Sequence, residues 1–179
     1  MSGEASSTRG ARRWTRPVAG RKLPGGRIAD RLSRPSAAII EQLDALPAAT
    51  ARDPRTGKGR HTVLVTLRRT GVRVATPVWA AVADGMMYAR TQRASGKIKR
   101  LRNNDSVLLA PCSVRGEPLA APVPGRARVL GPEEEHVAEA ALRRAHGPVR
   151  AFCAVLQDLL RVDMCYVAIT VDDRPAPAR

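Results

Sequence analysis

Near its start the chain carries apolar residues at the spacing of one helical face. These residues are Ile39, Ile40, Leu43 and Leu46, within the run SAAIIEQLDAL. Spacings of three and four residues put side chains on one side of an α-helix, so we expect an amphipathic helix over 36–46. Ser36 can cap its first turn, and Pro47 ends it. Residues 47–60 are expected to form a loop.

From residue 61 the apolar residues alternate with polar ones, which is the spacing of half-buried β-strands. Thr70-Gly71 and Asp84-Gly85 are turn signals that join the first three strands as hairpins. Pro122 and Pro124 place the fifth strand at an edge or in an irregular stretch, because proline cannot donate to a strand ladder. The predicted strands are 61–69, 72–83, 86–91, 106–114, 122–130 and 164–171.

Three further helices are expected between these strands. A short one begins near Ser95 and ends at Asn103-Asn104. Another opens at Pro132, has acidic residues in its first turn, and ends near Gly147, where Pro148 starts the next. Antiparallel hairpins with helices inserted late indicate an α+β fold whose sheet closes into a small barrel with peripheral helices.

The length of 179 residues indicates one domain with flanking segments. Residues 1–34 are rich in Arg, Gly, Ser and Pro and are expected to be a disordered basic arm. The domain is predicted over 35–174, followed by a tail at 175–179. No apolar run approaches the roughly 18 residues that span a bilayer, so we expect a cytoplasmic protein with no membrane partner.

The net charge of +15 raises the question of nucleic acid binding. Residues 1–34 hold nine basic and two acidic residues, a net charge of +7, and the remaining chain carries +8. Aromatic residues make up only 3%, which leaves few stacking platforms for bases, so nucleic acid is not the expected partner. The three cysteines and three histidines lack the spacing of a disulfide framework or metal site, and no metal is expected.

The segment SGKIKRLRNN (95–104) is the strongest candidate for chemistry. A strand ends at Arg90-Thr91 and a helix begins at Ser95-Gly96-Lys97, where N–H groups at the helix start favour an anion. Lys97 and Arg100 lie three residues apart and can converge on one phosphate. The run lacks the GxxxxGK[ST] and GxGxxG patterns. These residues alone are compatible with two interpretations of the segment, a phosphate pocket and an ordinary basic helix at the surface.

Four motifs in order, spread over about 50 residues, carry a resemblance to a known family. They are GxxxxTPVW (71–79), YxRT (88–91), SGKxKRxRNN (95–104) and APCxxRGxP (110–118). Together they resemble the pyridoxamine 5′-phosphate oxidase superfamily, and more narrowly its branch of oxidoreductases that use coenzyme F420, a deazaflavin. The resemblance implies an antiparallel split β-barrel of the FMN-binding type. It also implies a homodimer with one cofactor at each edge of the interface.

The resemblance assigns roles residue by residue. It puts Thr76, Pro77, Val78 and Trp79 along the flavin-like ring. It gives the phosphate to Arg90, Thr91, Ser95, Gly96, Lys97 and Arg100. It places Pro111, Cys112 and Ser113 at the border of the ring or its side chain, although a buried structural thiol is the simpler reading of Cys112.

Three alternative functions are compatible with these sequence features. The first is an oxidoreductase that uses reduced coenzyme F420 to reduce a small organic substrate, with no catalytic side chain because the cofactor carries the hydride chemistry. The second is an FMN-binding relative, either an enzyme or a flavin carrier, since a phosphate site does not separate the two cofactors. The third is a non-enzymatic protein that binds nucleic acid through the arm or stores a cofactor.

Overall fold

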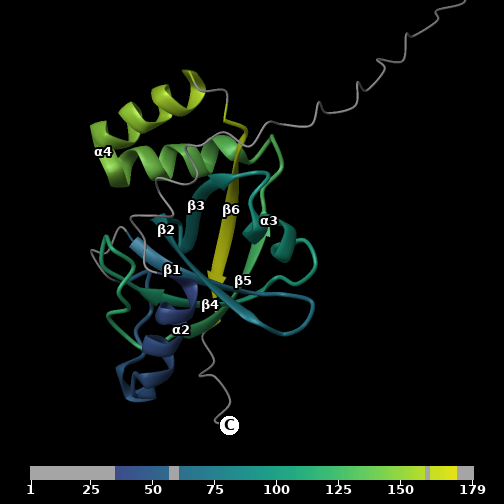
Figure 1. The fold of residues 1–179 in the computed structure, drawn as a ribbon. Helices are drawn as coiled ribbons and strands as arrows, with labels where there is room; N and C mark the ends of the chain where they lie inside the picture. Colours follow the sequence, from purple (N-terminus) through teal and green to yellow (C-terminus); the bar gives the residue numbers. More distant parts are fainter. Residues whose placement is uncertain (1–34, 57–60, 160–161, 173–179) are drawn as a thin grey trace, which may run out of the picture.

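Six antiparallel strands close into a barrel in the order β1-β2-β3-β6-β5-β4 (Figure 1). The structure is a computed structural model that describes residues 35–56, 61–159 and 162–172. The strands are β1 (His61–Leu67), β2 (Arg73–Ala83), β3 (Met86–Gln92), β4 (Ser106–Pro111), β5 (Val123–Val129) and β6 (Met164–Val171). The helices are α2 (Ser36–Ala45), the 3-10 turn η1 (Ala48–Thr50), α3 (Gly96–Leu101) and α4 (Glu135–Leu159). The predicted arm (1–34) and tail (175–179) lie outside the described residues.

This architecture confirms the predicted α+β split barrel. All six predicted strands form, and the β2–β3 hairpin turns at Asp84-Gly85, where both residues have positive φ (51° and 73°). Two left-handed residues in a row suit the twist of a hairpin, which explains the Asp-Gly pair. No helix in the described part of the chain is long and apolar enough to cross a membrane.

The prediction that β5 is an edge or irregular strand is wrong, because β5 pairs with both β4 and β6 in the closed barrel. Pro124 lies within the strand, opposite Leu108. Its carbonyl accepts a hydrogen bond from the Asp172 N–H, one residue past the end of β6. The missing proline N–H therefore falls where β6 has already ended, and the ladder loses no bond.

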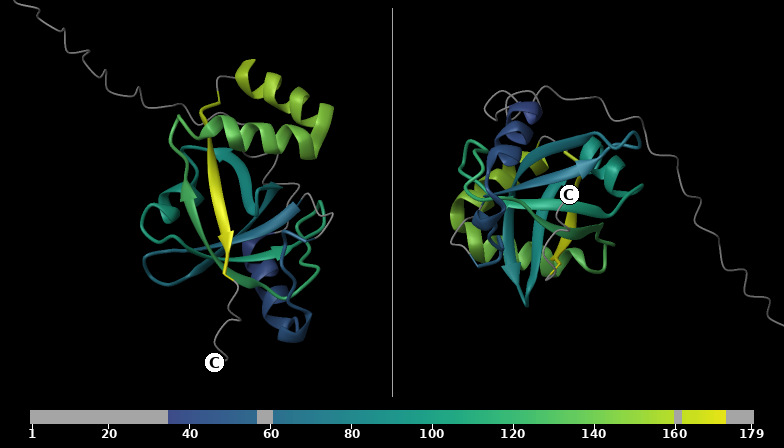
Figure 2. Two further views of the ribbon diagram at one scale, coloured as in Figure 1. Left: turned by 180° about the vertical axis from the view of Figure 1, so that it is seen from behind. Right: turned by 90° about the horizontal axis from the view of Figure 1, so that it is seen from below.

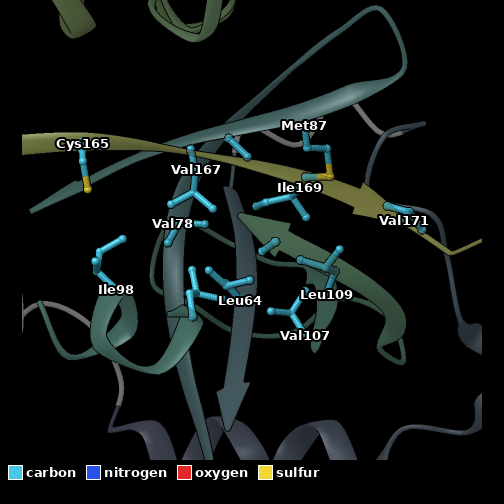
Figure 3. Close-up of a cluster of buried hydrophobic side chains, with 14 residues drawn as sticks. Leu64, Val78, Met87, Ile98, Val107, Leu109, Cys165, Val167, Ile169 and Val171 are labelled. Carbon is cyan, nitrogen blue, oxygen red and sulfur yellow. The ribbon is translucent and has the colours of Figure 1, made fainter. Parts of the chain in front are cut away.

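The barrel interior holds the main hydrophobic core, with side chains contributed by all six strands (Figure 3). Helix α3 closes one end of this core. Its Ile98 and Leu101 are 0% and 6% exposed and join the interior residues. The predicted inward face of this short helix is therefore confirmed.

Two helices cover the outside of the barrel (Figure 2). Helix α2 packs Ile39 and Leu43 against the outer side of β1, β2 and β4. Ser36 is the first helical residue and not the cap that the sequence predicts; its hydroxyl instead accepts a hydrogen bond from the Ala75 N–H. This bond ties the helix to β2 and leaves Pro35 as an N-cap without a side-chain hydrogen bond.

Helix α4 packs Ala138, Ala141 and Leu142 against the outer side of β3 and β6. Two helices were expected here, and they run together with a break at Gly147, whose φ of 55° and ψ of −143° are not helical. Pro148 follows this break directly and starts the second half, as the sequence predicts. The first half of α4 lies across the strands in Figure 1.

Candidate functional site

Strand β2 changes partner along its length, which opens a gap in the hydrogen-bonded wall of the barrel. Its residues 73–79 pair with β1, and only Ala80–Ala83 pair with β3. Strand β3 pairs with β2 as far as Ala89, and its residues 90–92 pair with β6 alone. Beyond the Ala80–Ala89 pair the two strands diverge. We call the gap between residues 73–79 and 90–92 the seam.

The predicted ring-binding residues Thr76–Trp79 form one lip of the seam. Their side chains alternate, so Thr76 and Val78 point into the barrel and Pro77 and Trp79 point outward. The four side chains therefore do not share one face. What they share is the strand edge turned away from β1, where alternate backbone groups point into the seam.

The predicted phosphate residues gather at the barrel end that α3 closes. The Lys97 ammonium donates to Thr91 Oγ1 of β3 at 2.7 Å. The Arg100 guanidinium donates through Nε to Thr66 Oγ1 of β1, also at 2.7 Å. Both threonines are on the interior side of their strands and are buried. Two cations on one turn of helix thus span the space from β3 to β1, on either side of the divergent part of β2.

Ser95 and Gly96 complete this group. Gly96 lacks a Cβ that could block a ligand at the helix start, and that role stays a prediction. A Cβ at Gly96 would lie 3.0 Å from Arg100 Nη1, so the glycine makes room for the guanidinium. Ser95 Oγ is buried and has no hydrogen-bond partner among the described residues. We call Thr66, Thr91, Ser95, Lys97 and Arg100 the mouth cluster.

The charge at the mouth cluster is strongly positive. Burial, followed by repulsion from Arg68, lowers the pKa of Arg100 from its ordinary value. The neighbouring acids are already engaged by other arginines, Asp163 by Arg93 and Asp105 by Arg126. Because α3 has only six residues, its dipole is small and the side chains carry the charge. An anion placed here would be attracted by the ammonium of Lys97 and the guanidinium of Arg100.

Arg90 lies on the other lip of the seam but on the outer face, away from the mouth cluster. It pairs with Tyr166 across β3 and β6, and its guanidinium carbon lies 5.8 Å from the centre of the Tyr166 ring. Arg90 and Thr91 therefore point to opposite sides of β3. A phosphate held by Lys97 and Thr91 inside the barrel mouth is not reached by Arg90 without a change of side-chain conformation.

Trp79 is 38% exposed on the outer face, in contact with two histidines. Its ring stacks on His146 of α4 at 5.2 Å between centroids and meets the edge of His61 at 5.8 Å. His146 is itself held by a 2.9 Å hydrogen bond between Nε2 and the Ala80 carbonyl. The indole is therefore fixed beside the seam with part of its surface open to solvent.

Pro111, Cys112 and Ser113 lie apart from the mouth cluster, and their role at the border of the ring stays a prediction. The turn that follows Ser113 reaches the β2 lip, where a Cβ at Gly116 would lie 2.5 Å from Pro77 Cγ. Pro111 pairs with Thr62 on β1, which separates β4 from the seam by two strand spacings, about 10 Å. Cys112 packs under α2, and burial raises the pKa of its thiol to about 12. A buried thiol with a raised pKa is neutral at physiological pH, as expected for a structural cysteine.

Several residues at the site were not predicted from the sequence. They are Thr66, Glu139, His146 and Tyr166. Each reaches the site through a contact with a residue at least 27 positions away, such as Tyr166 with Glu139. The sequence carries one weak signal for Thr66, a polar residue on the inward side of an otherwise apolar strand. Within the described residues no three potential metal ligands come together.

Comparison with solved structures places this barrel among known folds. HutZ, the heme storage protein from Vibrio cholerae, matches with a TM-score of 0.51 at 11% identity, over 79% of this chain and 92% of HutZ. A FAD-binding protein from Mesorhizobium loti matches with a TM-score of 0.45 at 16% identity, over 64% of this chain and 80% of its own. A Listeria innocua protein provisionally assigned as a pyridoxamine 5′-phosphate oxidase matches with a TM-score of 0.44 at 13% identity, over 80% and 98%.

At these identities the likeness is one of fold. The HutZ match shows that the closed barrel with its peripheral helices is a fold that other proteins adopt. No protein family model and no curated protein matches the chain.

Proposed function

We propose that this chain is an oxidoreductase of the pyridoxamine 5′-phosphate oxidase type that uses reduced coenzyme F420 to reduce a small organic substrate. The observation that carries the proposal is the mouth cluster. Lys97 and Arg100 lie at a gap in the barrel wall, and each is held by a threonine hydroxyl that a phosphate oxygen could join or replace. Three of the four sequence motifs contribute to this region: TPVW forms a lip of the seam, and YxRT and SGKxKRxRNN supply Thr91, Ser95, Lys97 and Arg100.

The described residues fit a phosphate-bearing group. Lys97 and Arg100 supply charge, and Ser95 Oγ is a buried hydroxyl without a partner among the described residues that could donate to a phosphate oxygen after rotation. Thr91 and Thr66 would orient the two cations. Arg90 lies on the outer lip over Tyr166, where it would meet the outer edge of the ring and not the phosphate.

A flat ring would lie along the β2 lip. The Ala75 N–H, which points away from β1, is taken by Ser36. By alternation, the backbone groups of Pro77 and Trp79 point the same way, toward the seam. Flavins and deazaflavins carry ring carbonyls and N–H groups that could bond to these backbone groups. The indole of Trp79, fixed by His146, would then cover the outer edge.

When bound, the cofactor supplies the hydride chemistry itself. The chain would bind the phosphate, align the ring against the strand edge and keep water from one of its faces. We propose no catalytic side chain. The proton that accompanies the hydride would come from solvent or from the cofactor.

Surface charge supports coenzyme F420 over FMN. The oligoglutamate tail of the deazaflavin needs cations beyond the phosphate, and exposed Arg68, Arg69, Lys99 and Arg102 surround the mouth cluster. None of them forms an ion pair within the described residues. FMN lacks such a tail and would leave these side chains unused. We also propose a homodimer in which the partner chain covers part of the seam.

The test is a set of titrations with purified protein. Coenzyme F420, FMN and heme would each be added while fluorescence and visible absorbance are followed; heme is included because HutZ stores it. We expect coenzyme F420 to bind with a Kd below about 100 μM and more tightly than FMN. Tighter binding of FMN would favour the alternative function of an FMN-binding protein. If neither coenzyme F420 nor FMN binds, the proposal is refuted. DNA binding that disappears on deletion of residues 1–34 would assign the charge of the arm to nucleic acid.

A further inference from the structure

A row of three large side chains crosses the outer face of the barrel at the seam. Arg90 and Tyr166 pair directly across β3 and β6. Trp79 comes directly before Ala80 on β2, and Arg90 comes directly after Ala89 on β3, so both lie next to the Ala80–Ala89 pair and point outward. Trp79 and Arg90 thus stand on the two lips of the seam, and Tyr166 stands behind Arg90.

Helix α4 holds both ends of this row. Tyr166 Oη donates a short 2.5 Å hydrogen bond to Glu139 Oε2, and His146 stacks on Trp79. Glu139 and His146 are seven residues apart, which places them on one face of the helix about 10.5 Å apart. At Ala80 and Ala89, the pair where β2 and β3 are still joined, the distance from β6 across β3 to β2 is two strand spacings, about 9.6 Å. The helix spacing is therefore close to the strand spacing at the point where the seam begins.

The two contacts differ in chemistry. A phenol that donates to a carboxylate becomes richer in electrons, which strengthens the attraction of its ring for the Arg90 guanidinium. On the other lip, His146 bonds to the Ala80 carbonyl and so presents its ring flat to the indole, with an interplanar angle of 20°. Glu139 thus orients Arg90 indirectly, through its hydrogen bond to Tyr166, whereas His146 orients Trp79 by direct stacking.

We propose that Glu139, Tyr166 and His146 are positioning residues for the cofactor site, with α4 fixing the orientation of Arg90 on one lip of the seam and Trp79 on the other. This inference rests on the proposed function, because it supposes that a cofactor lies between the lips. It assigns a role in cofactor affinity to a helix that contains none of the predicted site residues.

The test for the Glu139 branch is a double-mutant cycle. Tyr166→Phe keeps the ring and removes the hydroxyl, and Glu139→Gln keeps the shape and removes the charge. Each should raise the cofactor Kd by about three- to tenfold, the worth of one hydrogen bond, and the double variant should do no more. In an Arg90→Lys background, which lacks the planar guanidinium, neither change should have a further effect.

The test for the His146 branch uses Trp79 as its own probe. Trp14→Phe leaves Trp79 as the one tryptophan of the chain, since the sequence has two. His146→Ala should shift its emission and weaken cofactor binding, and His146→Phe, which can still stack, should restore much of both. Arg143→Ala, on the exposed side of the same helix, is the matched control and should change neither.

The outcomes separate the two proposals. If the parent protein binds neither cofactor, the proposed function fails and this inference falls with it. If it binds and the Glu139, Tyr166 and His146 variants bind equally well, the inference alone is overturned. It is also overturned if the Glu139 and Tyr166 variants keep their full effect on affinity in the Arg90→Lys background. It is overturned as well if the three variants weaken cofactor binding only in proportion to their loss of melting temperature, as an unrelated core substitution would.

Discussion

Lys97 and Lys99 offer a matched pair for testing the phosphate site. Both are lysines on α3, two positions apart. Lys97 turns inward and donates to Thr91 Oγ1 at 2.7 Å, whereas Lys99 is exposed to solvent. We predict that Lys97→Ala weakens cofactor binding and that Lys99→Ala affects it far less. The two substitutions remove the same charge and differ only in where the ammonium lies.

The magnitude follows from the geometry. A hydrogen bond from an ammonium to a phosphate is worth about 1.5–3 kcal/mol, which corresponds to roughly a 10- to 150-fold rise in Kd. Lys99 would contribute only through longer-range attraction, which salt screens over about 10 Å. Fold stability should change by less than about 1 kcal/mol, since Lys97 is half-buried and water can replace its bond to Thr91.

The assay is a fluorescence titration of coenzyme F420 and FMN with the parent protein and both variants, at low and at high salt. Thermal melting curves accompany each titration. The Lys97→Ala loss should persist at high salt, and any Lys99→Ala loss should disappear. Equal losses for both variants would mean that general charge, and not a built site, attracts the cofactor. Unchanged affinity with early melting of Lys97→Ala would make α3 a structural element only.

Three further outcomes are expected. Thr66→Val removes the hydroxyl that holds Arg100 and should lower the unfolding free energy by about 1 kcal/mol in urea and weaken cofactor binding. Cys112, whose pKa burial raises to about 12, should resist iodoacetamide at about pH 8 until the protein unfolds, as peptide mass spectrometry would show. A hydrogen bond from Arg128 lowers the pKa of Glu134 from 4.5 to about 2. This stabilisation is present above the unfolded pKa and is lost as pH falls through the folded pKa of about 2. In denaturant titrations Glu134→Gln should therefore be less stable than the parent at neutral pH, and the difference should shrink toward zero as pH falls below about 2.

Much of the fold could be predicted because it follows from local patterns. Alternating apolar residues locate the strands, Asp84-Gly85 sets the β2–β3 hairpin, and Gly147-Pro148 sets the break in α4. The prediction that β5 is an edge strand was wrong because the sequence around Pro124 does not show which strands lie on either side of it. Whether a proline costs a hydrogen bond depends on where the neighbouring strand ends, and that depends on closure of the whole barrel.

The site was predictable only in part, for a similar reason. Lys97 and Arg100 stand out in the sequence, but the hydroxyls that orient them depend on pairing across the barrel. Arg90 and Thr91 are neighbours in the sequence and point to opposite faces of β3, which a motif does not show. Gly96 suggests space for a ligand, and the structure places the Arg100 guanidinium beside that space.

The central claim is that the phosphate of a flavin-type cofactor lies in the mouth cluster. A crystal structure of the protein saturated with whichever of coenzyme F420 and FMN binds more tightly tests this directly. We expect phosphate oxygens within hydrogen-bonding distance, about 2.7–3.2 Å, of Lys97 Nζ and the Arg100 guanidinium, with the ring along residues 76–79. A phosphate bound elsewhere on the barrel, out of reach of Lys97 and Arg100, would refute it.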